Sequence, residues 1–303
     1  ELLKKFGFNR ISLGIQDFRN DVLDAINRKP SKHPINEIVA KIKSEGFTGT
    51  NIDLVYGLPL QTISSFEKTV EKAIELKTER LVTFSYAHVP SVLPRQKILE
   101  KIGFPNQSEK AEMYENSYKK FIESGYISIG MDHYSLPEDE FAIALKNKNL
   151  HRNFQGYCTR ETTGQVYAFG ASAISQLNSA YSQNIKNAAQ YITSIEKNNL
   201  AVFRGFSVNN EQKIVRDTIN SIMCNYYLDL FEIADKNNCS IDKVIDIIDF
   251  KSSKFQDFIS DNLIEIENSK LIVFEKGRLF TRNIAMRFDP LINQKVGTYS
   301  NTI

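Results

Sequence analysis

The sequence predicts an α/β fold in its first part and a mostly helical second part. Short strand-like runs alternate with amphipathic helices up to about residue 135, and beyond about residue 180 the pattern becomes largely helical. Strand–helix units of this length join parallel strands through right-handed crossovers. We therefore expect a partial barrel of strand–helix units over 1–180, followed by a helical domain over 181–303.

Four strand-like runs support the first half of this prediction. In the first run Ile11, Leu13 and Ile15 recur at a period of two, which is typical of a strand with one buried face. The runs cover 10–16, 50–56, 80–86 and 126–132. Four units are too few to close a barrel, and a half-barrel would leave a parallel edge unpaired. Either a partner supplies the missing strands or, as we favour, the chain is part of a longer protein.

Amphipathic helices are expected between these runs. Apolar residues at helical spacing form one face from Ile35, Ile38, Val39 and Ile42, and another from Phe66, Val70, Ala73 and Ile74. Thr62 or Ser64 can cap the start of the second helix, because a hydroxyl oxygen accepts a hydrogen bond from a free backbone N–H there.

The second part is expected to contain helices over 184–198, 210–236 and 240–262, and a last helix from about Lys276. Between them, 263–274 reads as a β-hairpin that turns at Asn268 and Ser269. Helices followed by a hairpin are typical of a winged-helix module. The nearby charge is mixed, so we expect a packing role for this module and no nucleic-acid binding.

Composition excludes several classes of protein. Lys and Arg number 38 against 36 Asp and Glu, a formal net charge of +2, which gives no basic surface for nucleic acid or anionic membranes. No run of about 18 apolar residues predicts a membrane span. The three cysteines, Cys158, Cys224 and Cys239, are too far apart for a metal motif, so we expect reduced thiols in a cytoplasmic protein and no metal site in this chain.

Polar residues stand where the predicted strands end. Gln16, Asp53, the stretch 86–88 and the pair Asp132-His133 occupy such positions, which carry the working residues of parallel α/β barrels. Asp53 interrupts an apolar run, where an unpaired carboxylate would be costly to bury. It is either a ligand-binding group or a carboxylate satisfied by a neighbouring arginine or loop amide, and the sequence leaves both open.

Arg28 and His133 each allow two interpretations. Arg28 follows a helix that begins near residue 17, so it can complement the helix C-terminus or hold a ligand carboxylate in a two-pronged bond. His133, next to Asp132, is the best candidate for proton transfer or substrate binding, although a structural hydrogen bond is the alternative.

Two further segments have the composition of ligand-binding loops. Residues 151–157 combine cationic, amide and aromatic groups without helix or strand periodicity, and 168–175 are rich in small side chains. Small side chains permit close approach of backbone to a flat ligand, and they equally permit tight helix–strand packing.

Together these segments resemble the oxygen-independent coproporphyrinogen III oxidases, which belong to the radical S-adenosylmethionine enzymes. The match runs in order through Gly7–Phe18, Asn51–Pro59, Tyr86–Pro90, Gly130–Tyr134 and His151–Tyr157, and continues to the end of the chain. The resemblance implies a partial (β/α) radical-enzyme barrel and a helical C-terminal domain. It also implies cleavage of S-adenosylmethionine at a [4Fe-4S] cluster, so that a 5′-deoxyadenosyl radical converts two propionates of coproporphyrinogen III to vinyl groups in haem synthesis.

The resemblance assigns roles to individual residues. Gln16, Arg28, Asp53 and Ala87 match positions that contact S-adenosylmethionine, and Gln155 and Ile174 match positions that line the cofactor region. For the substrate carboxylates we expect cationic partners, and Arg152, Arg160 and His133 are the candidates.

The chain departs from this family in two respects, of which one is the absence of the family's Gly-rich cofactor segment near the second strand. It contains no Cys-x-x-x-Cys-x-x-Cys motif, and cluster ligation requires thiolates at close spacing. We expect the cluster and its electron donor to belong to a longer protein and this chain alone to be inactive. The alternative is a cluster-less haem-binding or haem-chaperone-like protein. A winged-helix DNA binder is a third, less favoured interpretation.

Overall fold

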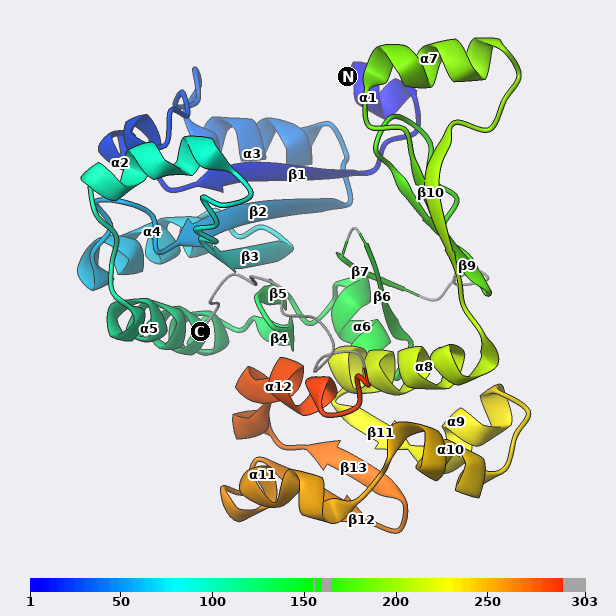
Figure 1. Cartoon of the computed structure of the whole chain (residues 1–303). Helices are drawn as coiled ribbons and strands as arrows, with labels where there is room; N and C mark the ends of the chain where they lie inside the picture. The colour runs from blue at the N-terminus through cyan, green and yellow to red at the C-terminus, as the bar shows by residue number, and fades with distance from the viewer. Residues whose placement is uncertain (155, 160–164, 291–303) are drawn as a thin grey trace. The chain divides into compact units, whose positions relative to one another are not determined.

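The computed structural model describes residues 1–154, 156–159 and 165–290 (Figure 1). The described chain forms two compact units, Glu1–Ile143 and a second unit that begins at Ala144. The first unit is α/β, as predicted, and the second mixes helices with small antiparallel sheets. The domain boundary near residue 180 stays a prediction.

A five-stranded sheet in the order β1-β2-β3-β5-β4 is the centre of the first unit. Its strands are β1 (Arg10–Gln16), β2 (Gly49–Tyr56), β3 (Arg80–Ser85), β4 (Ile127–Gly130) and β5 (His133–Ser135). The pairs β1–β2 and β2–β3 are parallel, which confirms the three crossover-linked strands expected from the sequence. In this sheet β1 and β4 are the edge strands.

The fourth predicted strand needs a correction. The run 126–132 forms β4 only over Ile127–Gly130, and β5 returns antiparallel between β3 and β4. The chain reverses at Met131, whose φ of 51° is a turn conformation that an apolar side chain rarely adopts. His133 therefore begins the returning strand β5, after a two-residue turn that follows β4.

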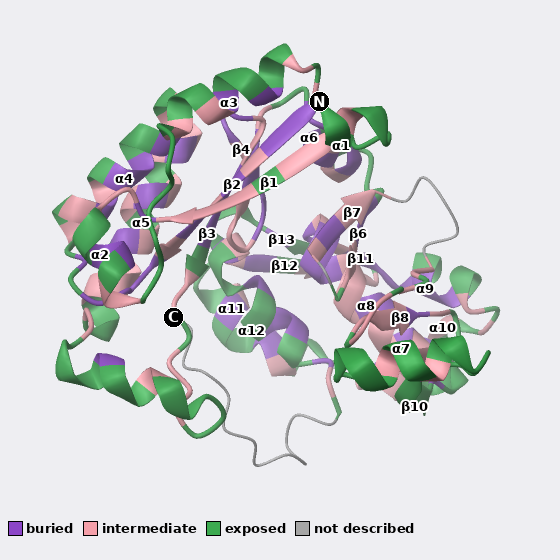
Figure 2. Ribbon diagram, turned by 90° about the horizontal axis from the view of Figure 1, so that it is seen from above, coloured by how far each residue is buried: buried purple, intermediate pink, exposed green. Residues whose placement is uncertain are grey.

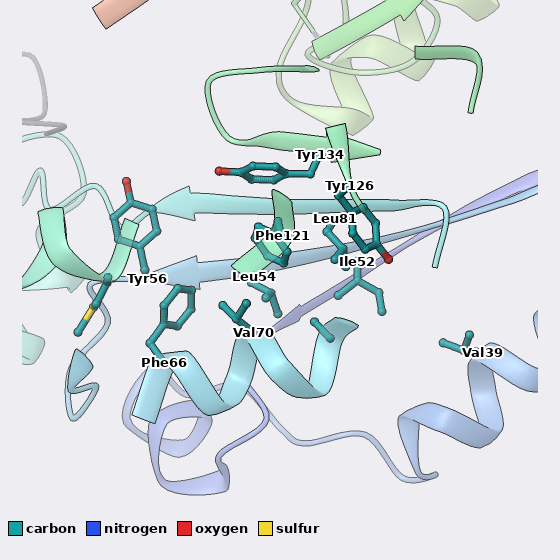
Figure 3. Packing of buried hydrophobic residues seen from close by; sticks show 12 residues of the cluster. Val39, Ile52, Leu54, Tyr56, Phe66, Val70, Leu81, Phe121, Tyr126 and Tyr134 are labelled. Atoms are coloured by element: carbon teal, nitrogen blue, oxygen red, sulfur yellow. The ribbon is translucent and has the colours of Figure 1, made fainter. Parts of the chain in front are cut away.

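One face of the sheet packs on helices, as Figure 3 shows for Phe66 and Val70 of α4 beneath Leu54 of β2. The helices of this unit are α1 (Leu2–Lys5), α2 (Asn20–Ala25), α3 (Ile35–Ser44), α4 (Ile63–Glu75), the 3₁₀ segment η1 (Pro94–Lys101), α5 (Gln107–Glu123) and α6 (Glu140–Lys146), whose last residues enter the second unit. Thr62 caps α4 by accepting from the Ser65 backbone N–H, as expected.

Burial alternates along β2, with Ile52, Leu54 and Tyr56 buried and the residues between them partly exposed (Figure 2). Alternation at a period of two means that one set of side chains enters the core and the other lies on the opposite face of the sheet. That opposite face carries the polar residues that the sequence singled out.

The second unit contains the helices predicted after residue 181, which are shorter than expected and have short strands between them. Its elements are β6 (Leu150–Asn153), β7 (Gly156–Thr159), β8 (Ile174–Gln176), β9 (Ala180–Asn184), α7 (Ala188–Glu196), β10 (Val202–Ser207), α8 (Asn210–Asn225), β11 (Tyr227–Asp229), α9 (Leu230–Lys236), α10 (Ile241–Ile248), η2 (Ser252–Phe255), α11 (Gln256–Ser260), β12 (Ile264–Glu267), β13 (Lys270–Val273), η3 (Glu275–Phe280) and α12 (Thr281–Met286). The strands form the sheets β10-β9-β8, β11-β13-β12 and β6-β7.

The expected long helices are interrupted where the backbone turns left-handed. Helix α8 ends at Tyr226 with φ 56°, and α10 ends at Asp249 with φ 46°. The hairpin of β12 and β13 is confirmed, and it turns at Asn268 and Ser269, both with positive φ. Two positive φ values suit the twist of a two-residue hairpin loop. The winged-helix character of this region stays a prediction.

Candidate cofactor site on the polar face of the sheet

The polar face of the sheet is the face opposite α4 and α5. The strand register places Gly14, Asp53, Val82 and His133 in one row across β1, β2, β3 and β5. A second row, nearer the amino ends of the parallel strands, contains Ser12, Asn51, Arg80 and Ser135. Because ladder partners project to the same side of a sheet, these side chains share one surface.

Gly14 is the point at which Gln16 and Arg28 meet. An Arg28 guanidinium nitrogen donates to the Gly14 carbonyl oxygen. A Cβ atom on Gly14 would lie 3.0 Å from Gln16 Nε2 and 3.4 Å from Arg28 Nη2. The register shifts between Gly14 and Gln16, and Gln16 has a φ of 70°, so the bulge turns its side chain back over Gly14.

The polar groups at this point are incompletely paired. Gln16 Oε1 is buried and has no hydrogen-bond partner among the described residues. Arg28 is exposed, and within the described part of the chain it forms no ion pair. A buried amide oxygen without a partner is costly, so this end of β1 is arranged for a ligand that brings hydrogen-bond donors and a carboxylate.

Asp53 is held by two neutral side chains. Its Oδ1 accepts from Asn51 Nδ2 at 2.7 Å, and its Oδ2 accepts from Ser12 Oγ at 3.2 Å. No cation of the described residues pairs with it. The arginine partner that the sequence left open is therefore not what satisfies Asp53, and its charge remains available to a ligand.

The adjoining cavity has cationic side chains that can pair with the carboxylate of a ligand. It measures about 640 Å³, and its lining includes Gly14, Arg28, Lys29, Lys32 and apolar residues of β1 and α3. Three cations beside an apolar wall fit a molecule that joins a carboxylate to an apolar group. Asp17 also lines this cavity; it is buried, and its carboxylate accepts from Gln61 and Thr69, which fixes the end of β1.

Ala87 lies in the chain segment that follows β3. Its carbonyl accepts from Gln96 Nε2 at 2.9 Å, while Gln96 Oε1 accepts from Val89 N at 2.6 Å. One glutamine side chain thus pairs with two backbone groups as a neighbouring strand would.

Lys110 Nζ donates to the Tyr86 carbonyl at 3.3 Å, and burial lowers the pKa of Lys110. Burial also raises the pKa of Tyr86.

His133 lies in the same row as Asp53, with one strand between them. Its Nδ1 is 2.8 Å from Asp132 Oδ1, and its ring makes an edge contact with Phe84 at 6.0 Å between centroids. Two strand spacings separate the backbones of Asp53 and His133 by roughly 10 Å. The structural hydrogen bond is present, and the partly buried imidazole still faces the polar side of the sheet.

The remaining candidates belong to the second unit. Ile174 begins β8 and pairs with Gln183, and the Arg152 guanidinium lies 5.6 Å from the Tyr157 ring centroid. Gln155 and Arg160 lie outside the described residues. The three cysteines lie on separate elements, on β7, in α8 and after α9. No group of His, Cys, Asp and Glu in the described ranges could hold a metal ion.

Sequence reasoning missed Ser12, Asn51 and Gly14 as parts of this site. Each lies an even number of residues from Gln16 or Asp53 on the same strand, and this spacing predicts a shared face of the sheet. The register that brings β1 beside β2 cannot be deduced from the sequence. Gln96 gave no signal, because its role depends on the course of the loop after β3.

Comparisons with known proteins identify relatives of this chain. Residues 1–73 match the model of the Radical SAM superfamily. A protein from Thermostichus vulcanus named oxygen-independent coproporphyrinogen III oxidase is 36% identical over 99% of this chain and 92% of its own length. The Escherichia coli (strain K12) protein of the same name is also 36% identical, over 97% of this chain and 63% of its own length.

A solved structure extends the likeness to the fold. The E. coli coproporphyrinogen III oxidase (HemN), described as a radical SAM enzyme, matches with a TM-score of 0.89 at 36% identity over 96% of this chain and 66% of that one. The chain thus spans a little under two thirds of the E. coli relative. In the described residues no helix has the length and apolar character needed to cross a membrane.

Proposed function

Because this chain belongs to the family of oxygen-independent coproporphyrinogen III oxidases, we propose that its protein converts two propionates of coproporphyrinogen III to vinyl groups in haem synthesis. The product would be protoporphyrinogen IX, formed without oxygen. A cytoplasmic location and an electron donor for the cluster stay predictions from the sequence.

The observation that carries this proposal is the arrangement of Gln16 and Arg28 around Gly14, beside Asp53. The Gln16 Oε1 acceptor without a partner, the Arg28 guanidinium without an ion pair and the space over Gly14 between these two side chains (the glycine cradle) fit S-adenosylmethionine, which has a carboxylate, an ammonium group and ribose hydroxyls. When bound and reductively cleaved, this cofactor supplies the 5′-deoxyadenosyl radical that takes hydrogen from a propionate. The protein's contribution is to orient the reactants and exclude side reactions.

Each candidate residue has a role in this proposal. Arg28 binds the methionine carboxylate, and Gln16 and Asp53 accept from donors of the cofactor. Ala87 contributes backbone groups. Gln155 and Ile174 line the cofactor region by the resemblance alone.

We assign the substrate carboxylates to cationic side chains. Arg152, Arg160 and His133 are the proposed partners, with His133 also the candidate for proton transfer, because a tetracarboxylate requires positive charge where it binds. For His133, its position on the polar face in the row of Asp53 supports this role.

The thiols of this chain do not fit a [4Fe-4S] cluster. Cys158, Cys224 and Cys239 lie on different elements, and Cys224 is buried. We therefore propose that these 303 residues do not start the radical reaction by themselves. Cleavage of S-adenosylmethionine by this chain after cluster reconstitution would contradict that proposal.

Titration calorimetry with S-adenosylmethionine tests the cofactor site. Loss of a hydrogen bond between charged groups predicts that Arg28→Ala lowers affinity about tenfold to a hundredfold. Arg204→Ala is the matched control, because this exposed arginine of β10 bonds only Gln183 among the described residues. Equal affinity of the Arg28→Ala and wild-type chains would overturn the assignment, and tight haem binding without S-adenosylmethionine binding would favour the haem-chaperone alternative.

A further inference from the structure

Ser12, Asn51 and Asp53 form a closed hydrogen-bonded triangle across β1 and β2. Asn51 Nδ2 lies 2.8 Å from Ser12 Oγ and 2.7 Å from Asp53 Oδ1, and Ser12 Oγ lies 3.2 Å from Asp53 Oδ2. Ser12 and Asn51 are register partners, and Asp53 is two residues beyond Asn51 on the same face. All three side chains therefore project from rigid strand positions.

The chemistry of the three groups fixes the direction of every bond. An ionised carboxylate only accepts, so Ser12 donates to Asp53 and must itself accept from Asn51. A reversed Asn51 amide would place its oxygen 2.7 Å from a carboxylate oxygen and leave Ser12 without a donor. In the arrangement that remains, Asn51 Oδ1 is buried without a partner among the described residues.

The triangle holds the Asp53 carboxylate without neutralising it. Each carboxylate oxygen receives one neutral donor and keeps further capacity to accept. Because no cation of the described residues pairs with Asp53, its orientation depends on these two side chains. A carboxylate fixed in this way is prepared for donors that a ligand brings, and a freely rotating one would lose conformational entropy on binding.

We propose that Ser12 and Asn51 are positioning residues that orient Asp53 toward S-adenosylmethionine. This inference rests on the proposed function and deepens it, since it explains how a strand carboxylate is kept ready for the cofactor. Neither residue needs to touch the cofactor, so both act through Asp53.

Affinity for S-adenosylmethionine, measured by calorimetry on the full chain, tests the proposal through double-mutant cycles. We expect Ser12→Ala and Asn51→Leu each to lower affinity by about threefold to tenfold, less than the direct loss of a hydrogen bond to a charged group, because both residues act only through Asp53. Ser12→Thr keeps the hydroxyl and should stay within about twofold of wild type. Ser135→Ala is the control, since its hydroxyl lies in the same row and has no partner among the described residues.

The decisive comparison uses Asp53→Asn as background. If Ser12 and Asn51 act through Asp53, their substitutions add less than about twofold to its effect. Full additivity in this background, or unchanged affinity of the Ser12 and Asn51 single variants, would overturn the inference while leaving the cofactor site intact. Absence of S-adenosylmethionine binding by the wild-type chain, or unchanged affinity of the Asp53→Asn chain, would contradict the proposed cofactor site and this inference together.

Discussion

The polar face of the first unit's sheet carries ion-paired charges at one end and charges without ion pairs at the other. At the amino end, Arg80 Nε lies 2.9 and 3.0 Å from the two Asp139 carboxylate oxygens, and Arg80 Nη2 lies 2.8 Å from Glu140. Arg10 lies 3.3 Å from each of the same two acids. The Asp139 side chain is only 2% exposed, so these charges form a paired and partly buried network.

At the carboxyl end the charges are left unpaired. Asp53 has only the neutral donors Ser12 and Asn51, Arg28 has only a backbone carbonyl, and Gln16 Oε1 has no partner in the described part of the chain. Unpaired polar groups cost stability unless a ligand completes them. This difference supports the proposal that the polar face serves stability at its amino end and cofactor binding at its carboxyl end.

The largest expected effect comes from breaking the paired end. Arg80→Ala leaves the buried Asp139 carboxylate with Arg10 and the Phe141 backbone N–H. We expect a loss of about 2 to 3 kcal/mol, less than the cost of about 3 to 5 kcal/mol that is typical of a buried charge left without a partner. Hydrogen exchange of β1–β3 amides measures the free energy of opening of this sheet. Arg80→Lys keeps the charge and should lose less, whereas a loss below about 1 kcal/mol for Arg80→Ala would remove the distinction between the ends.

A smaller effect, on affinity and not on stability, is expected at the unpaired end. In Gly14→Ala the new Cβ meets the flexible ends of Gln16 and Arg28, which can move aside. We expect stability within about 1 kcal/mol of wild type and affinity for S-adenosylmethionine reduced about tenfold, because the cradle is filled. Gly205→Ala in β10, close only to the Tyr181 carbonyl, is the control. Unchanged affinity of the Gly14→Ala chain would argue against the cradle.

The smallest predicted effect concerns a buried phenol near the amino end. Tyr126 donates to the Thr78 carbonyl at 2.7 Å, and burial raises the pKa of Tyr126 from 10 to about 12. Because the folded-state pKa is raised, its contribution to stability is complete below pH 10 and is lost as pH rises toward about 12.

Tyr126→Phe is the matched variant for this phenol. The variant loses one hydrogen bond, worth about 1 kcal/mol at neutral pH, but should lose less stability than wild type on going to high pH. Urea unfolding between about pH 10 and pH 12 measures how the free energy of unfolding changes with pH in the wild-type and Tyr126→Phe chains. Equal slopes for the two chains would show that Tyr126 does not titrate differently on folding.

The sequence predicted the elements that depend on local pattern. The apolar periods of β1, α3 and α4, the Thr62 cap and the hairpin turn at Asn268 and Ser269 are confirmed. The sequence did not predict β5, because the chain reverses at Met131 in a left-handed conformation, which is not expected of an apolar residue. Antiparallel return between β3 and β4 depends on pairing that sequence periodicity does not specify.

For the candidate site, the resemblance to the family named the residues, and the structure shows their positions and contacts. Gln16 and Asp53 are 37 positions apart in the sequence, and the strand register and the bulge before Gln16 bring them to Gly14. Arg28 reaches Gly14 from the segment after α2, through its hydrogen bond to the Gly14 carbonyl. Ser12 and Asn51 escaped notice because a serine and an asparagine on a half-exposed strand are ordinary. Their importance comes from the bonds that they make to Asp53.

The central claim is that the carboxyl end of the polar face is built for the cofactor and the amino end for stability. Hydrogen exchange of β1–β3 amides, with and without S-adenosylmethionine, tests both halves in the wild-type, Arg80→Ala and Arg28→Ala chains. At about 100 times the wild-type Kd, linkage predicts a gain of about 2.7 kcal/mol for wild type and Arg80→Ala, although Arg80→Ala starts from a lower stability. Arg28→Ala should start at the wild-type stability and gain about half as much or less. The claim would be contradicted if Arg28→Ala lost as much stability as Arg80→Ala, or gained as much from the cofactor as wild type.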